Sequence, residues 1–145
     1  MRAALVAVSV AVAGVAVEAL PASGPQIADA AGCVRVVGGQ FDPDGNENYM
    51  PTLNQEYVKI RNVCSRRKDL TGWRVNDYGK IHVYRFRSGF HIGAGVTIKL
   101  RSGVGTDTAA NLYWGRTYGA IWNNTGTERV YLRNASGTTV STWTV

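Results

Sequence analysis

The sequence has few of the side chains on which enzymes and metal sites depend. Its 145 residues include only two histidines, His82 and His91, and two cysteines, Cys33 and Cys64. No Gly-x-Ser-x-Gly, His-Glu-x-x-His or Gly-Lys-Ser/Thr motif occurs in it. Two cysteines without a third cysteine or a histidine at ligand spacing do not make a zinc site. The sequence therefore predicts no catalytic residue, no metal and no cofactor, and we expect a protein that is not an enzyme.

Long apolar runs are also missing, except near the N-terminus. Met1 and Arg2 are followed by an almost wholly apolar stretch at 3–17, and small residues follow it. This run of about 15 residues is shorter than the roughly 20 that a bilayer core requires. Residues 1–30 are therefore predicted to be a signal peptide, cleaved near residue 22 or near residue 30. A membrane anchor is the alternative; the prediction is a secreted, extracellular protein with no transmembrane anchor in its mature form.

The remaining residues, 33–145, suit one domain with a core of its own. Removing residues 1–30 takes away Arg2, Glu18 and Asp29, so the formal charge changes from +6 to +6 − 1 + 2 = +7. A basic exported domain attracts polyanions such as extracellular nucleic acid, anionic wall polymers or a lipid surface.

Helical periodicity is absent, and apolar residues instead alternate in short runs separated by Gly, Asn and Asp. This pattern is typical of an all-β sandwich. The predicted strands are 33–41, 56–62, 71–76, 81–87, 95–101, 112–114, 119–122, 128–133 and 138–144. The alternation places these side chains in the core: Val34, Val36, Val58, Ile60, Leu70, Trp73, Val75, Tyr84, Phe86, Val96, Ile98, Leu100, Val130 and Leu132.

The two cysteines are predicted to form a disulfide. If strand 33–41 runs antiparallel to strand 56–62 with paired positions summing to 97, Arg61 faces Val36 and Cys64 lies opposite Cys33. Export to an oxidising compartment would let the bridge persist. Two buried unpaired thiols are the alternative.

Several segments together resemble one known family. In chain order they are Glu56-Tyr57-Val58, Leu70-Thr71-Gly72-Trp73, Tyr84-Arg85-Phe86, Gly103-Val104-Gly105-Thr106-Asp107-Thr108, Tyr113-Trp114-Gly115 and Trp122-Asn123-Asn124. This set is similar to the lamin-tail domain, in its single-domain secreted actinobacterial form, over about 34–140. The resemblance implies an immunoglobulin-like β-sandwich and a noncatalytic role in binding or assembly, with nucleic acid or protein partners. Two departures are Thr127, where the family has an acidic turn, and the C-terminal end, which lacks the family's Asp and Cys.

Basic side chains occupy the outward positions of the predicted strands, with two tyrosines among them. We predict that a polyanion binds to some or all of these residues: Lys59, Arg61, Arg85, Arg87, Lys99, Arg101, Arg129, Arg133, Tyr57 and Tyr131. Such residues hold phosphates with little sequence preference, and tyrosines stack on unpaired bases. The loop triplet Arg66-Arg67-Lys68 could extend the set. The alternative is that outward strand positions carry charge for solubility alone.

The sequence also has features that bear on protein, carbohydrate and calcium binding. A protein-interaction or structural module would use the exposed strand edges or the long loop 42–55. Carbohydrate binding would need exposed tryptophans, and only Trp114 or Trp143 is expected at the surface. Segment 42–48 begins like a calcium loop, but Gly45 stands at its fourth position instead of the sixth. His82 shares the parity of Tyr84, which favours a hydrogen-bonded structural histidine.

Overall fold

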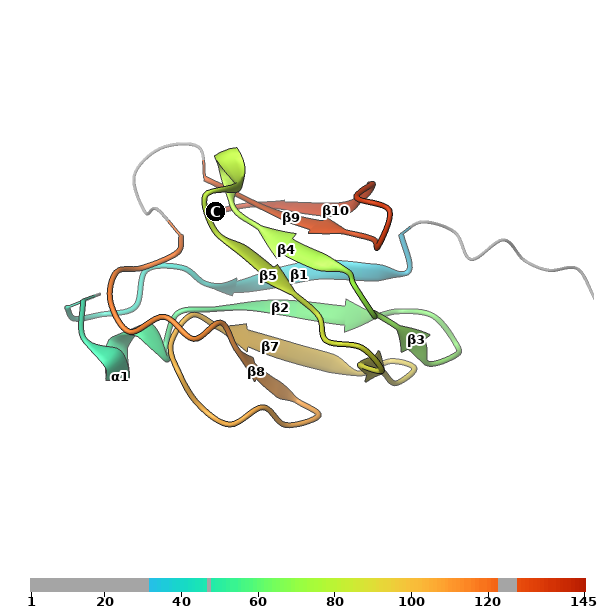
Figure 1. Cartoon of the computed structure of the whole chain (residues 1–145), viewed down its shortest axis with the longest axis horizontal. Helices are drawn as coiled ribbons and strands as arrows, with labels where there is room; N and C mark the ends of the chain where they lie inside the picture. Colours follow the sequence, from blue (N-terminus) through green and yellow to red (C-terminus); the bar gives the residue numbers. More distant parts are fainter. Residues whose placement is uncertain (1–31, 47, 123–127) are drawn as a thin grey trace, which may run out of the picture.

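The protein is a sandwich of two four-stranded β-sheets, as the computed structural model in Figure 1 shows. The structure describes residues 32–46, 48–122 and 128–145. The predicted signal peptide at 1–30 and the predicted turn around Asn124 and Thr127 lie outside these residues. The strands are β1 (Val34–Gln40), β2 (Tyr57–Asn62), β3 (Lys68–Asp69), β4 (Arg74–Asn76), β5 (Val83–Arg85), β6 (His91–Ile92), β7 (Thr97–Arg101), β8 (Asn111–Tyr113), β9 (Arg129–Arg133) and β10 (Thr139–Thr144).

The first sheet has the order β1-β2-β7-β8 and the second has the order β10-β9-β4-β5. Every pairing within them is antiparallel except β7 with β8, which is parallel. β3 and β6 form a separate two-stranded sheet at one end. The all-β sandwich prediction is therefore confirmed, and among the described residues the helical pieces are α1 (Met50–Leu53) and the 3-10 turn η1 (Tyr78–Lys80). No described helix is long and apolar enough to cross a membrane.

One predicted strand is wrong. Residues 119–122 form no strand, although Ile121 and Trp122 are buried. Their apolar side chains pack into the core from an irregular segment. The apolar sequence pattern therefore indicated burial correctly, but it did not indicate pairing with a neighbouring strand. The short strands β3 and β6 were not predicted, because two-residue pairings have too few positions to show alternation.

The core lies between the two sheets and contains the predicted apolar set with three differences. Trp73 and Tyr84 are only partly buried, though both pack against the core. Val96 is 41% exposed, so its core placement is wrong. It lies in the turn before β7, where its amide bonds to the carbonyl of Gly93. Buried apolar residues outside the set that the alternation placed in the core are Leu53, Phe90, Ile92, Leu112, Ile121 and Trp122.

The predicted disulfide is confirmed. Cys33 and Cys64 are bonded, with 5.3 Å between their Cα atoms. The predicted register is right on only one side of a bulge. Gly38 lies opposite Lys59 as predicted, but Val36 lies opposite Ile60 instead of Arg61. The register shifts between Val36 and Gly38, because a bulge adds one residue to β1.

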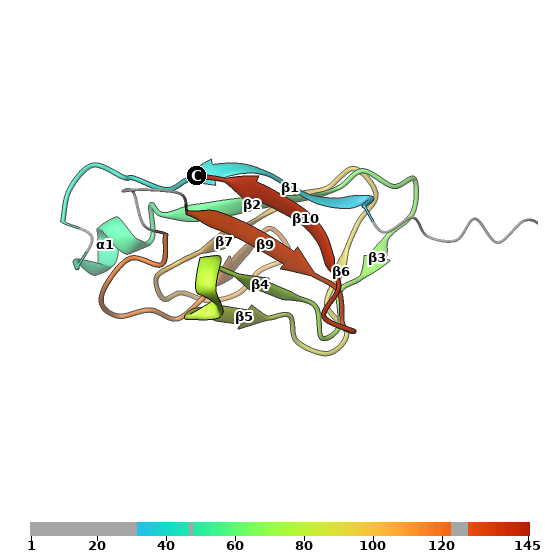
Figure 2. The ribbon, with the colours of Figure 1, turned by 90° about the horizontal axis from the view of Figure 1, so that it is seen from above.

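The two sheets meet along one side of the sandwich. β10 packs beside β1, as Figure 2 shows, and the amide of Val36 donates a hydrogen bond of 3.1 Å to the hydroxyl of Ser141. This side-chain acceptor satisfies a main-chain donor on the outer edge of β1. The edges of β5 and β8 lie on the opposite side of the sandwich. The loop predicted at 42–55 is partly fixed, because Leu53 of α1 is 1% exposed.

Candidate polyanion-binding faces

The ten residues predicted to bind a polyanion lie on two different sheets. Residues of β2 and β7 project from the first sheet: Tyr57, Lys59, Arg61, Lys99 and Arg101. Residues of β5 and β9 project from the second sheet: Arg85, Arg129, Tyr131 and Arg133. Arg87 is exposed in the segment that follows β5. The two outer faces point away from each other, so the ten residues do not form one contiguous patch.

On the first sheet, strand register gathers three cations around one tyrosine. Tyr57 is paired with Arg101, and Lys59 is paired with Lys99. The Lys99 ammonium lies 4.6 Å from the centre of the Tyr57 ring, the Arg101 guanidinium carbon 5.5 Å and the Lys59 ammonium 5.8 Å. Cation–π attraction holds the cations close to the ring despite their mutual repulsion.

Arg35 is a further member of this face that the prediction missed. It is exposed on β1 and lies directly opposite Arg61. The alternation of Val34 and Val36 would have revealed it, because the residue between two buried positions of a strand points outward. We call Arg35, Tyr57, Lys59, Arg61, Lys99 and Arg101 the first basic face.

The cations of this face differ in how firmly the protein holds them. Arg101 is anchored, because its guanidinium donates to the carbonyl of Asn54 at 2.6 Å and to Oδ1 of Asn111 at 3.2 Å. Among the described residues, Lys59, Arg61 and Lys99 make no ion pair, and no acidic side chain occupies an outward position on the four strands of the sheet. These three cations are therefore free to bind anions from solution.

On the second sheet, three arginines lie in one row across neighbouring strands. Arg74 is paired with Arg85 on one side and with Arg133 on the other. Arg74 was not among the predicted residues, although it precedes the buried Val75 and so has outward parity. Its Nε is buried and has no hydrogen-bond partner among the described residues. Like charges placed directly opposite one another destabilise a sheet, so this row of arginines lowers the stability of the folded protein.

The basic loop triplet lies apart from both faces. Arg66 and Arg67 are exposed in the loop between β2 and β3, and Lys68 begins β3. They belong to the end of the sandwich that carries the two-stranded sheet, as Figure 1 shows for β3.

The histidines and acidic residues form no site of another kind within the described ranges. His82 is a hydrogen-bonded structural histidine, as predicted, because its Nδ1 lies 2.9 Å from Oδ2 of Asp77. Another hydrogen bond joins the His82 amide to Oδ1 of the same carboxylate at 3.0 Å. No three His, Cys, Asp or Glu side chains come together in a metal-binding group in 32–46, 48–122 or 128–145.

The tryptophans offer one exposed ring. Trp73 and Trp122 pack in or against the core as predicted. Trp114 does so too, with its ring 5.7 Å from Tyr84 and 5.8 Å from Trp122, so its expected exposure is wrong. Trp143 is 40% exposed on β10. A single exposed indole gives little support to a sugar-stacking surface.

The pKa values of Tyr84 and Asp69 are shifted, and neither residue belongs to the first basic face. Burial, reinforced by the charge of Asp107, raises the pKa of Tyr84 to about 12. Hydrogen bonds from the side chain and main chain of Thr71 lower the pKa of the exposed Asp69. Both shifts have structural causes, so they do not mark a catalytic centre.

Comparison with protein families gives a match over most of the chain. The family model described as Lamin Tail Domain matches residues 29–145, which is most of the chain. A comparison with curated proteins found no match. The lamin-tail domain is a noncatalytic, immunoglobulin-like binding or structural module, and the observed sandwich agrees with that fold. Because this match covers most of the chain, the chain belongs to the lamin-tail domain family.

Proposed function

We propose that this protein is an exported, noncatalytic binding module that holds polyanions, nucleic acid foremost, on its first basic face. The observation that carries the proposal is the grouping of Lys59, Lys99 and Arg101 around the ring of Tyr57. Arg35 and Arg61 continue the positive surface along β1 and β2. The face has no acidic side chain among its outward strand positions.

The chemistry of this face suits a phosphate backbone. Exposed lysine and arginine side chains bind phosphates and release condensed counterions, which gives affinity with little sequence preference. Tyr57 offers an aromatic ring on which an unpaired base could stack, in place of a lysine that now lies over the ring. The expected ligand is therefore a flexible polyanion, with single-stranded nucleic acid preferred over duplex.

Two features support export. The apolar stretch at 3–17 reads as a signal peptide, and the Cys33–Cys64 bridge persists best in an oxidising compartment. The expected location is the extracellular space. Detection of the protein in culture medium with its N-terminal segment removed would support this part, and retention of that segment on a cell-associated protein would contradict it.

The test is a titration of the protein with labelled single- and double-stranded DNA at several salt concentrations. Binding should fall log-linearly with salt, with a slope that grows by about 0.7 to 0.9 for each phosphate neutralised. The informative variant combines Lys59→Ser, Arg61→Ser and Lys99→Ser, since none of the three cations holds another part of the fold. Its slope should fall by about 2 to 3.

The matched control combines Arg85→Ser, Arg87→Ser and Arg129→Ser. It removes the same charge from outside the first basic face, so its DNA affinity should stay near that of the unchanged protein. Equal losses in both variants would show that net charge alone attracts the DNA. No binding even at low salt would retire the polyanion proposal and leave a module for protein partners.

A further inference from the structure

A small pocket opens on the second sheet, on the side of the sandwich that faces away from the first basic face. It lies where β4 and β9 meet the η1 turn, and its volume is about 290 Å³. This is near the lower end of the range for small-molecule sites. It belongs to a different sheet from the proposed nucleic-acid surface.

One end of the pocket carries a fixed guanidinium. The Nε of Arg133 donates to Oδ1 of Asn76 at 3.0 Å, and its Nη1 donates to the carbonyl of Gly137 at 3.3 Å. Its guanidinium carbon lies 5.3 Å from the centre of the Tyr131 ring. These contacts fix the orientation of the planar group, while Nη2 makes no hydrogen bond within the described chain. A fixed guanidinium with a free N–H edge is suited to a carboxylate or phosphate oxygen.

Lys80 adds a second cation at the rim, in an unusual backbone conformation. Lys80 has φ 60°, the only positive φ of a non-glycine residue in the described chain, and it follows Gly79 at φ 83°. The surrounding turn is held in place, because Asp77 binds both the amide and the ring of His82. The amide of Tyr78 also donates to Glu128 at 2.8 Å. Strain of this kind persists only where neighbouring contacts determine the backbone, and it is common at ligand sites.

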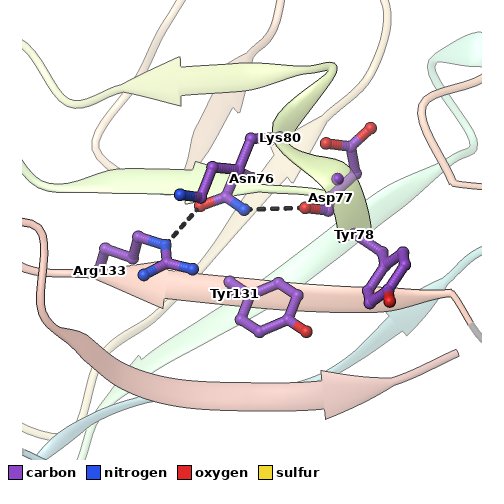
Figure 3. Close-up of a pocket in the computed structure, with 7 residues that line it drawn as sticks. Asn76, Asp77, Tyr78, Lys80, Tyr131 and Arg133 are labelled. Atoms are coloured by element: carbon purple, nitrogen blue, oxygen red, sulfur yellow. Dashed lines mark hydrogen bonds between the residues drawn. The ribbon is translucent and has the colours of Figure 1, made fainter.

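The other end of the pocket is aromatic. Figure 3 shows the Tyr131 ring next to the Arg133 guanidinium and the Tyr78 ring beyond it, with Asn76 between Arg133 and Asp77. Asn76 is 2% exposed, and its amide accepts from Arg133 and donates to the carbonyl of Asp77. Asp77 lines the pocket with its main chain, while its carboxylate points away from Arg133 in Figure 3. The pocket therefore has a cationic end, an aromatic end and no carboxylate turned toward Arg133.

We propose that this pocket binds a small organic anion, namely a flat ring that carries one carboxylate or phosphate group. The anionic group would lie between Arg133 and Lys80, and the ring would lie along Tyr131 toward Tyr78. Charge and ring are both needed, because a surface ion pair alone contributes little in water. Burial of the ring against the tyrosines supplies the rest of the affinity.

The test uses ¹⁵N-labelled protein titrated with phenyl phosphate and with benzoate, which together distinguish the two anionic groups. At least one should give saturable shifts of the Asn76, Tyr78 and Lys80 amides. Inorganic phosphate and phenol, which each lack one half of the ligand, should bind about tenfold more weakly or worse, equivalent to about 1.4 kcal/mol. Absence of saturable shifts with both ring anions would overturn the proposal, as would equally tight binding of inorganic phosphate.

Variants test which groups are used. Lys80→Gly removes the ammonium and suits the positive φ, so the variant should fold and still bind several-fold more weakly. Tyr131→Val keeps a residue suited to β9 and should weaken phenyl phosphate while leaving inorganic phosphate unchanged. Arg67→Gln, in the loop between β2 and β3 and apart from both faces, is the control and should bind like the unchanged protein. Unchanged affinity in Lys80→Gly, or an equal loss in Arg67→Gln, would refute the assigned cationic end.

Discussion

Lys59 on β2 lies directly opposite Lys99 on β7, so two like charges occupy one cross-strand pair in the middle of the first sheet. Opposed like charges destabilise a sheet, and opposite charges stabilise it by about 0.2 to 1 kcal/mol. Tyr57 offsets part of the repulsion through its ring. A sheet selected for stability alone would favour a carboxylate at one of these positions, which is why the pair supports a role in anion binding.

Exchanging one of these charges should separate stability from binding. Lys59→Glu places a carboxylate beside Lys99, so we expect the free energy of unfolding to rise by a few tenths of a kcal/mol up to about 1 kcal/mol. DNA affinity should fall at the same time. Urea unfolding and a DNA titration measure the two effects, and Lys59→Gln is the control that removes charge without adding the pair. Lower stability in the Glu variant would contradict the inferred repulsion.

The row of arginines on the second sheet predicts a similar gain. Arg74→Met removes the middle charge between Arg85 and Arg133 and a buried Nε that has no partner among the described residues. We expect stability to increase by roughly 0.5 to 1 kcal/mol in thermal or urea unfolding. Arg85→Met, on the edge strand, removes one neighbour only and should gain less. A large loss of stability in Arg74→Met would contradict this prediction and show that the Arg74 side chain stabilises the folded protein.

The disulfide should contribute a large part of the stability. Cys33 and Cys64 are 31 residues apart, and the loop-entropy relation gives about 3 to 4 kcal/mol for a loop of this size. The double variant Cys33→Ala with Cys64→Ala should therefore unfold at a markedly lower urea concentration. Reduction of the unchanged protein should reproduce the shift. A change below about 1 kcal/mol would show that the native hairpin does not need the constraint.

The titration of Tyr84 gives a pH-dependent prediction. Its pKa is raised in the folded protein to about 12 from an ordinary value of 10.0, mainly by burial. Since folding favours the protonated phenol, its contribution to stability is complete below pH 10 and is lost as pH rises toward 12. The stability of Tyr84→Phe should therefore decline less over this interval. In a pH titration of the folded protein followed by tyrosinate absorbance, Tyr84 should ionise at higher pH than the exposed ones among the seven tyrosines. Ionisation of Tyr84 near pH 10 would refute the assigned burial effect.

Local alternation predicted most of the strands, and eleven of the fourteen side chains that it placed in the core are buried. Val58 and Ile60 are buried between outward Tyr57, Lys59 and Arg61, as a period of two requires. The pattern failed where the main chain turns: Val96 has the parity of Ile98 but lies before β7 begins.

The division of the basic residues into two faces could not be predicted in this way. Parity states which side of a strand a residue is on, but the sheet to which a strand belongs depends on pairings between distant segments. β2 pairs with β7, and β4 pairs with β9 more than fifty residues later in the chain. The pocket escaped prediction for a related reason, because Asn76 and Arg133 meet only through that second pairing.

The contact between β1 and β10 also determines when the fold can be completed during synthesis. β10 pairs with β9 and lies beside β1, so it covers two edges at once. A growing chain that has not yet produced Thr139–Thr144 presents both edges uncovered, and uncovered edges pair with other chains. Of the ten described strands, the one that is synthesised last is therefore the one that protects the partly folded sandwich from aggregation. Truncations or fusions that displace β10 should impair yield before they impair any binding surface.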